Sequence, residues 1–155
     1  PKALEIVQEK LTHLPSNLQK NAKLLLLDKD SSSLPLENDS FDYVICLSVL
    51  SLLETYDRID NLISEFHRVM KPGAKMLVDI NGPGSDFSKH GKLIKDDLYE
   101  YRGISKTEEP RLCYCPQTPE RFKLLFRNFV IEDIGHVSFN YIGRESFEYL
   151  ACVKK

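Results

Sequence analysis

The sequence predicts an α/β fold built on a largely parallel sheet, and two observations carry this prediction. Short apolar runs of strand length alternate with stretches in which apolar residues recur every three or four positions, as expected when strands alternate with helices. The runs are apolar throughout, which is typical of strands buried on both faces of a parallel sheet. The last two runs have no helix between them, so we expect an antiparallel strand at the C-terminal end.

Three elements are predicted in the first third of the chain. Residues 3–14 carry apolar side chains at helical spacing and are followed by Pro15, which predicts an amphipathic helix that ends there. Residues 22–28 contain four consecutive leucines and predict a strand buried on both faces. Residues 41–47 predict a second strand because they are rich in β-branched and aromatic residues.

The middle of the chain predicts a helix, a strand and a long irregular segment. Residues 59–69 have the apolar face of a helix, which the Lys-Pro-Gly sequence at 71–73 ends with a cation and two breakers. Residues 76–80 predict the third buried strand. Residues 85–117 lack strand periodicity, and we expect only a short helix at 93–101. Since a loop this long is unusual unless it is functional, we predict a lid or substrate-binding insertion.

The C-terminal part predicts a helix and two strands. Residues 118–129 have an apolar helical face, with Thr118 suited to the N-cap and Asn128 to a left-handed C-terminal cap. Residues 130–137 and 147–153 predict the two closing strands.

Length and charge exclude several classes of protein. A chain of 155 residues fits one domain. Its 21 Lys and Arg against 23 Asp and Glu give a net charge of −2, so we expect no nucleic-acid partner. No apolar run approaches the roughly 18 residues that a membrane span needs, and residues 1–15 lack a signal-peptide pattern. We therefore expect a soluble, cytoplasmic domain.

The cysteines favour packing over metal binding. Cys46 and Cys152 lie in apolar runs, where a thiol acts as a small hydrophobe. Cys113 and Cys115 form a C-x-C pair, but no second pair or paired histidine completes the four ligands of a zinc site. We predict no metal site and reduced thiols, as in a cytoplasmic protein.

Ligands of open parallel sheets bind at the carboxyl ends of the strands. In this chain those ends are residues 28–33, 46–50 and 81–85. Asp30 is the most informative residue there, since a carboxylate followed by serine N–H groups can bind the edge of an adenine. The alternative is that Asp30 only caps a turn, as aspartate often does.

Three segments resemble class I S-adenosylmethionine-dependent methyltransferases. Residues 30–42 resemble the acid-x-x-x-Leu-Pro-Phe…Phe-Asp stretch of that family. Residues 65–74 resemble its Glu-x-x-Arg-Val-Leu-Lys-Pro-Gly-Gly helix end, with Ala74 replacing the second glycine. Residues 118–129 resemble its Thr-Pro-Glu…Gly-Phe helix, with Asn128 where glycine is usual. The motifs follow in the family's order over nearly the whole chain and are most similar to the type 11-like branch, which methylates small molecules.

The resemblance implies a Rossmann-like methyltransferase fold, S-adenosylmethionine as cofactor and a small-molecule acceptor. Asp30 would hold the adenine amine and the Ser31 N–H an adenine ring nitrogen. Cys46 and Leu47 would present their backbone to the methionine end of the cofactor. Methyl transfer is an in-line displacement that depends mainly on positioning, so no catalytic acid or base is assigned.

Three residues of the 85–117 segment are candidates for substrate contact. His90 is the best-placed histidine if a base is needed, although a solvated loop histidine is the simpler interpretation. Tyr99 and Tyr101 could line a substrate pocket, or they could be packing anchors.

One part of the family pattern is missing. The chain contains neither the Gly-x-Gly-x-Gly turn after the family's first strand nor the acid after its second, and Gly82-Pro83-Gly84 follows the wrong strand. The chain thus resembles a single methyltransferase domain, residues 1–155, that begins two strands late. In the family's sheet those two strands lie between the strands predicted at 22–28 and 41–47. The strand at 22–28 would then be unpaired, paired anew, or completed by a second copy in a homodimer.

Two other functions are open at this stage. A methyltransferase-like module that binds a partner without catalysing would explain the missing glycine turn. A nicotinamide-dependent oxidoreductase is disfavoured because no Gly-x-Gly-x-x-Gly occurs in the sequence.

Overall fold

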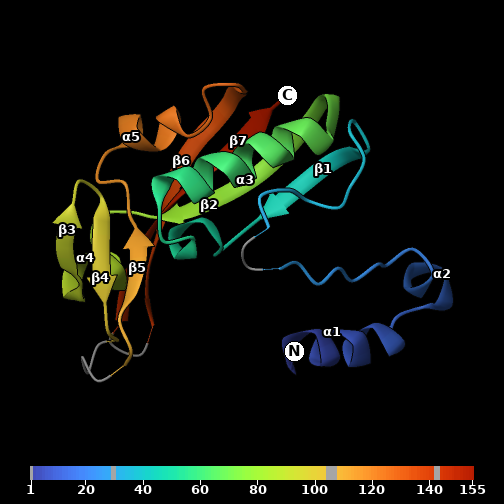
Figure 1. Ribbon diagram of the computed structural model, residues 1–155, viewed down its shortest axis with the longest axis horizontal. Coiled ribbons are helices and arrows are strands. Elements are labelled where there is room, and N and C mark those ends of the chain that lie inside the picture. Colours follow the sequence, from blue (N-terminus) through green and yellow to red (C-terminus); the bar gives the residue numbers. More distant parts are fainter. Residues whose placement is uncertain (1, 29–30, 104–107, 142–143) are drawn as a thin grey trace. The chain divides into compact units, whose positions relative to one another are not determined.

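The computed structural model describes residues 2–28, 31–103, 108–141 and 144–155 (Figure 1). The chain forms two compact units, Pro1–Leu34 and Pro35–Lys155. No helix among the described residues is both long and apolar enough to cross a membrane.

The N-terminal unit contains two helices, α1 (Lys2–Thr12) and α2 (Ser16–Gln19). The helix predicted at 3–14 is therefore confirmed as α1. The Gln19 side-chain amide donates to the carbonyl oxygens of Thr12 at 3.1 Å and Leu14 at 2.6 Å, which holds the turn between the helices.

The strand predicted at 22–28 is wrong, because these residues have no regular secondary structure. A strand is stabilised by hydrogen bonds to a neighbour, and no described strand pairs with this segment. Leu26 and Leu27 are exposed as a result.

The C-terminal unit is built on a four-stranded sheet in the order β1-β2-β7-β6. Its strands are β1 (Phe41–Cys46), β2 (Met70–Asn81), β6 (Val130–Tyr141) and β7 (Arg144–Lys154). β1 and β2 are parallel, and β7 is antiparallel to both β2 and β6. Three strands thus share one direction and β7 alone opposes them, which confirms the predicted fold class.

β2 begins earlier than predicted. The chain passes from α3 into the strand at Met70, and Phe41 pairs with Met70 while Tyr43 pairs with Lys75. The residues between them form a bulge in which Gly73 adopts a φ of 82°, a left-handed conformation that glycine accepts without steric cost. The Lys-Pro-Gly sequence therefore shapes the start of a strand as well as ending a helix.

Helix α3 (Tyr56–Val69) follows a short 3₁₀ turn, η1 (Leu50–Leu52), and α5 (Pro119–Leu124) follows β5. The predicted N-cap of α5 is confirmed, because the Thr118 hydroxyl accepts the Arg121 N–H at 3.3 Å. The predicted left-handed cap at Asn128 is wrong. The helix ends at Leu124, and the turns that follow close through i to i−3 hydrogen bonds, such as Phe129 N–H to Phe126 O at 2.9 Å. These bonds satisfy the helix end without a left-handed residue.

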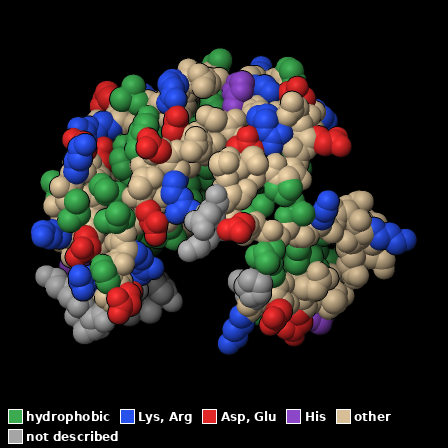
Figure 2. Space-filling model, viewed as in Figure 1, with side chains coloured by type: hydrophobic (Ala, Val, Ile, Leu, Met, Phe, Trp, Pro, Cys, Tyr) green, Lys and Arg blue, Asp and Glu red, His purple; other side chains and the backbone are tan. Residues whose placement is uncertain are grey.

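The main core lies where α3 and α5 pack on one face of this sheet (Figure 1). Its fully buried side chains include Ile59, Met76, Val78, Phe122, Phe126 and Val153. On the other face of β1, Tyr43 and Ile45 are 74% and 72% exposed, so the expectation that the strands are buried on both faces is wrong for β1. Charged side chains of both signs are interspersed over the surface seen in Figure 2, in keeping with the small net charge.

Residues 85–117 contain a second, three-stranded sheet where a short helix was predicted. The elements are α4 (Asp86–His90), β3 (Lys92–Lys95), β4 (Leu98–Tyr101) and β5 (Arg111–Tyr114), and the strand order is β3-β4-β5. The helix predicted at 93–101 is wrong, because this segment forms the β3–β4 hairpin. Tyr99 and Tyr101 are buried while Leu98 and Glu100 are only half-buried, which is the two-residue period of a strand.

Candidate functional site at the carboxyl ends of β1 and β2

The carboxyl ends of the two parallel strands lie side by side. Cys46, the last residue of β1, pairs with Val78 of β2. Leu47 then leaves the sheet, and Ser48 turns the chain with a φ of 59°. A non-glycine residue in this left-handed region is uncommon and is held only where its surroundings fix it.

A polar network fixes this turn. The Ser48 N–H donates to Asp79 Oδ1 at 2.6 Å, and the Asn81 N–H donates to Ser51 Oγ at 3.0 Å. The Asn81 side-chain amide donates to Glu148 Oε1 at 3.4 Å. Asp79 and Ser51 are buried. The segment after β1 is therefore tied to the end of β2, and β2 to β7, by polar side chains.

Burial controls the ionisation of this network. Burial raises the pKa of the Asp79 carboxyl, although the hydrogen bond from Ser48 opposes the rise. Burial and then the charge of Asp79 raise the pKa of Glu148. Burial, with a contribution from Asp79, also raises the pKa of the Cys46 thiol to about 12. Cys46 is thus a neutral thiol near neutral pH and has no thiolate to act as a nucleophile.

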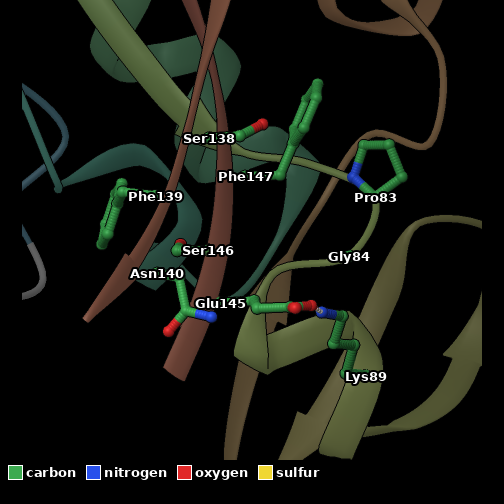
Figure 3. Close-up of a pocket in the computed structure, with 9 residues that line it drawn as sticks. All are labelled: Pro83, Gly84, Lys89, Ser138, Phe139, Asn140, Glu145, Ser146 and Phe147. Atoms are coloured by element: carbon green, nitrogen blue, oxygen red, sulfur yellow. Dashed lines mark hydrogen bonds and ion pairs between the residues drawn. The ribbon is translucent and has the colours of Figure 1, made fainter. Parts of the chain in front are cut away.

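A cavity of about 420 Å³ opens beyond the end of β2 (Figure 3). It is lined by Pro83, Gly84, Lys89, Ser138, Phe139, Asn140, Glu145, Ser146 and Phe147. Lys89 of α4 and Glu145 of β7 point toward one another and form an ion pair at 2.5 Å. The ion pair lowers the pKa of Glu145, so this carboxylate is a weak base. The cavity combines apolar ring surfaces with hydroxyl, amide and paired charged groups.

Two of the four predicted cofactor residues lie at the carboxyl end of β1, one lies in the N-terminal unit, and one lies outside the described residues. Cys46 and Leu47 lie at the carboxyl end of β1, with Cys46 buried and Leu47 exposed. Ser31 belongs to the N-terminal unit, and its hydroxyl donates to the Ser33 carbonyl at 2.7 Å. Asp30 lies outside the described residues.

The three candidate substrate residues do not line the cavity. His90 ends α4, with Nε2 at 4.0 Å from Asp86 Oδ1. Tyr99 and Tyr101 are buried in a small cluster with Cys113 and Cys115. In this structure both tyrosines pack the second sheet, and their contact with a substrate stays a prediction.

The buried cysteines of that cluster are unreactive. Burial raises the pKa of Cys113 to about 11 and that of Cys115 to about 12. In the described part of the chain, no group of three or more histidine, cysteine or acidic side chains is arranged to hold a metal ion.

Sequence reasoning missed the residues that form the polar network. Asp79 stands in the apolar run Met-Leu-Val-Asp-Ile, and a buried acid in such a run is costly unless it has a hydrogen-bond partner. That exception to the apolar pattern was the available signal. The cavity had none, because its lining residues come from two stretches, 83–89 and 138–147, that are far apart in the sequence.

Comparison with known proteins identifies similar domains. Residues 2–78 match the family described as "Methyltransferase domain". Among solved structures, an S-adenosylmethionine-dependent methyltransferase of Methanosarcina mazei is 18% identical, with a TM-score of 0.64 over 80% of this chain and 63% of that one. A protein of Pyrococcus horikoshii OT3 is 19% identical, with a TM-score of 0.63 over 86% of this chain and 59% of that one.

A third similar structure contains ligands. The 1,6-didemethyltoxoflavin-N1-methyltransferase of Burkholderia thailandensis, with bound 1,6-didemethyltoxoflavin and S-adenosylhomocysteine, is 14% identical, with a TM-score of 0.53. The match covers 76% of this chain and 45% of that one. The chain thus spans between 45% and 63% of the length of these three structures. No curated protein matches it.

Proposed function

We propose that the chain belongs to the class I S-adenosylmethionine-dependent methyltransferases and acts in methyl transfer from this cofactor to a small-molecule acceptor. The observation that carries the proposal is the fixed turn after β1. This turn lies at the carboxyl ends of the parallel strands, where ligands of α/β proteins bind. Because the chain spans only part of its structural relatives, the proposal concerns the protein that contains this domain.

The chemical groups at the carboxyl ends of β1 and β2 fit the cofactor. S-adenosylmethionine supplies an electrophilic methyl group on a sulfonium and carries a cationic amine at its methionine end. The carbonyl oxygens of Cys46 and Leu47 carry partial negative charge at the carboxyl end of β1, and the buried Asp79 carboxyl lies on the neighbouring strand β2. We propose that Cys46 and Leu47 meet the methionine end, and that Asp30 and Ser31 bind the adenine. The role of these residues is to hold two reactants in line, which is the main requirement of methyl transfer.

The cavity beyond β2 supports a small-molecule acceptor. Its volume of about 420 Å³ lies in the range of ligand pockets, and polar groups face apolar rings within it. The similar structure from Burkholderia thailandensis has 1,6-didemethyltoxoflavin bound, which supports the proposal of a small-molecule acceptor. His90, Tyr99 and Tyr101 stay candidates for contact with other parts of the acceptor. All four cysteines are free, which supports a cytoplasmic location.

We expect S-adenosylhomocysteine to raise the thermal stability of the protein. A ligand at ten times its dissociation constant stabilises the folded state by about 1.4 kcal/mol. Differential scanning fluorimetry over a concentration series would measure the shift, with NAD as the control ligand. An equal response to NAD, or no response to S-adenosylhomocysteine, would contradict the assignment of the cofactor site.

A second candidate function is a binding module that does not catalyse. It is favoured by the outer edge of β1, with which no described strand pairs, and by the exposed Tyr43 and Ile45 on the same strand. An open edge strand with exposed apolar side chains invites association with another chain. We propose a homodimer through this edge as the corresponding assembly.

The dimer makes its own prediction. We expect Ile45→Lys to shift the protein toward the monomer in sedimentation velocity, because a charge would be buried in the interface. Leu124→Lys is the matched control, since Leu124 is 61% exposed on α5, away from this edge. A monomeric wild-type protein, or equal effects of the two variants, would refute association through β1.

A further inference from the structure

Asp79 is an acidic residue inside the buried strand β2. Its neighbours Val78 and Ile80 belong to the hydrophobic core, and Asp79 itself is only 6% exposed. A buried carboxylate is costly, and it persists where it makes a strong hydrogen bond. The bond here is the short contact of 2.6 Å from the Ser48 N–H to Asp79 Oδ1.

The partner in this bond is the turn that follows the predicted cofactor residues. Ser48 comes directly after Cys46 and Leu47, and its φ of 59° is unfavourable for a residue with a side chain. Without the bond to Asp79, the backbone at Ser48 would be free to relax toward a commoner conformation. The relaxation would move the carbonyl groups of Cys46 and Leu47, because they precede the turn.

We propose that Asp79 is a positioning residue of the cofactor site, which acts by holding the Ser48 turn and hence the Cys46–Leu47 backbone against the methionine end of the cofactor. The proposal rests on the function proposed above. Asp79 is not a catalytic residue, because it acts through the Ser48 N–H and needs no contact with the reacting atoms.

The surroundings of Asp79 make this positioning dependent on pH. Two titratable groups on neighbouring strands interact with its charge, the neutral Cys46 thiol of β1 and the Glu148 carboxyl of β7. Burial among them raises the pKa of Asp79, so this carboxyl takes up a proton at a higher pH than an ordinary aspartate. The protonated carboxyl is a weaker acceptor for the Ser48 N–H, and the turn is then held less firmly.

Positioning and a purely structural role differ in the direction of this pH effect. A carboxyl whose pKa is raised by folding binds its proton more tightly in the folded state, so its contribution to stability grows as the pH falls. The affinity for the cofactor should change in the opposite direction and weaken as the pH falls. Stability and affinity measured on the same samples therefore separate the two roles.

The test is isothermal titration of the protein with S-adenosylhomocysteine from neutral to mildly acidic pH. We expect Asp79→Ala to weaken binding about tenfold at neutral pH, the effect of losing one hydrogen bond to a charged group. Asp79→Asn keeps an acceptor oxygen without the charge, so it should bind S-adenosylhomocysteine more tightly than Asp79→Ala does. Its affinity should not decline on acidification as that of the wild-type protein does. Glu148→Gln is the matched comparison. It should keep the wild-type decline in the same pH range, because burial and not the charge of Glu148 raises the pKa of Asp79.

The outcomes distinguish this inference from the proposed function. Wild-type protein that binds S-adenosylhomocysteine, with both Asp79 variants unchanged in affinity and pH profile, would overturn the positioning role and leave the methyltransferase function intact. Wild-type protein that binds no S-adenosylhomocysteine at any pH would overturn both. Thermal unfolding of each variant checks that it is folded, and Asp79→Asn preserves the shape of the side chain if Asp79→Ala does not fold.

Discussion

Replacing Phe122 by alanine is expected to lower the free energy of unfolding by about 3–5 kcal/mol, the usual cost of deleting a buried aromatic ring. Phe122 is the first apolar residue of α5 and is 0% exposed. Its ring meets Phe126 edge-on at 5.2 Å and stacks on Tyr149 of β7 at 5.4 Å. The ring therefore joins α5 to the sheet. Because Phe126 and Tyr149 are packed closely on both sides, they have little freedom to fill the space that the alanine substitution would leave.

Urea denaturation followed by circular dichroism would measure this loss. Leu124→Ala is the matched control, because Leu124 lies two residues further along the same helix and is 61% exposed. An exposed substitution of this kind changes stability by no more than about 0.5 kcal/mol. Similar losses in the two variants would show that the face of α5 in contact with the sheet is assigned wrongly.

The elements that could be predicted from the sequence are those whose pattern is local. The apolar face of α3 and the N-cap of α5 at Thr118 follow from spacing and capping preferences within a few residues. β1 was recognisable from its short apolar run, and β2 from the apolar run 76–80 within it, although the strand itself begins at Met70. The reversed direction of β7 was also predictable, because no helix separates it from β6.

The elements that could not be predicted depend on distant partners. Residues 22–28 have the composition of a strand, but no described strand pairs with them, and composition alone does not show whether a partner is present. Residues 93–101 form a hairpin because β4 also pairs with β5, which lies beyond residues 104–107 in the sequence. The link between Ser48 and Asp79 spans 31 positions, so no local pattern indicates it.

Asp97 connects the second sheet to the rest of the C-terminal unit through hydrogen bonds. These bonds matter for the prediction that residues 85–117 form a lid, because a lid must be able to open. Asp97 lies in the turn between β3 and β4 and is 2% exposed. Arg121 of α5 donates to its Oδ1 at 2.6 Å, and the Tyr114 hydroxyl donates to its Oδ2 at 3.5 Å. Burial and the charge of Asp97 raise the pKa of Tyr114, which keeps this phenol protonated as a donor. One carboxylate thus joins β3–β4, β5 and α5.

We expect Asp97→Ala to lower the free energy of unfolding by about 1.5–3 kcal/mol, since hydrogen bonds to a charged group are lost and Tyr114 is left without this acceptor. The control is Asp96→Asn, which removes the adjacent carboxylate and retains a residue that tolerates the φ of 46° at this position. Hydrogen exchange would locate the effect, because faster exchange should be concentrated in β3, β4 and β5. If exchange in these strands is already fast in the wild-type protein and Asp97→Ala leaves it unchanged, the attachment through Asp97 is refuted and a loosely held lid is the better description. If it is slow in the wild-type protein and rises only in the Asp97 variant, access to the cavity beside α4 does not depend on opening of this sheet.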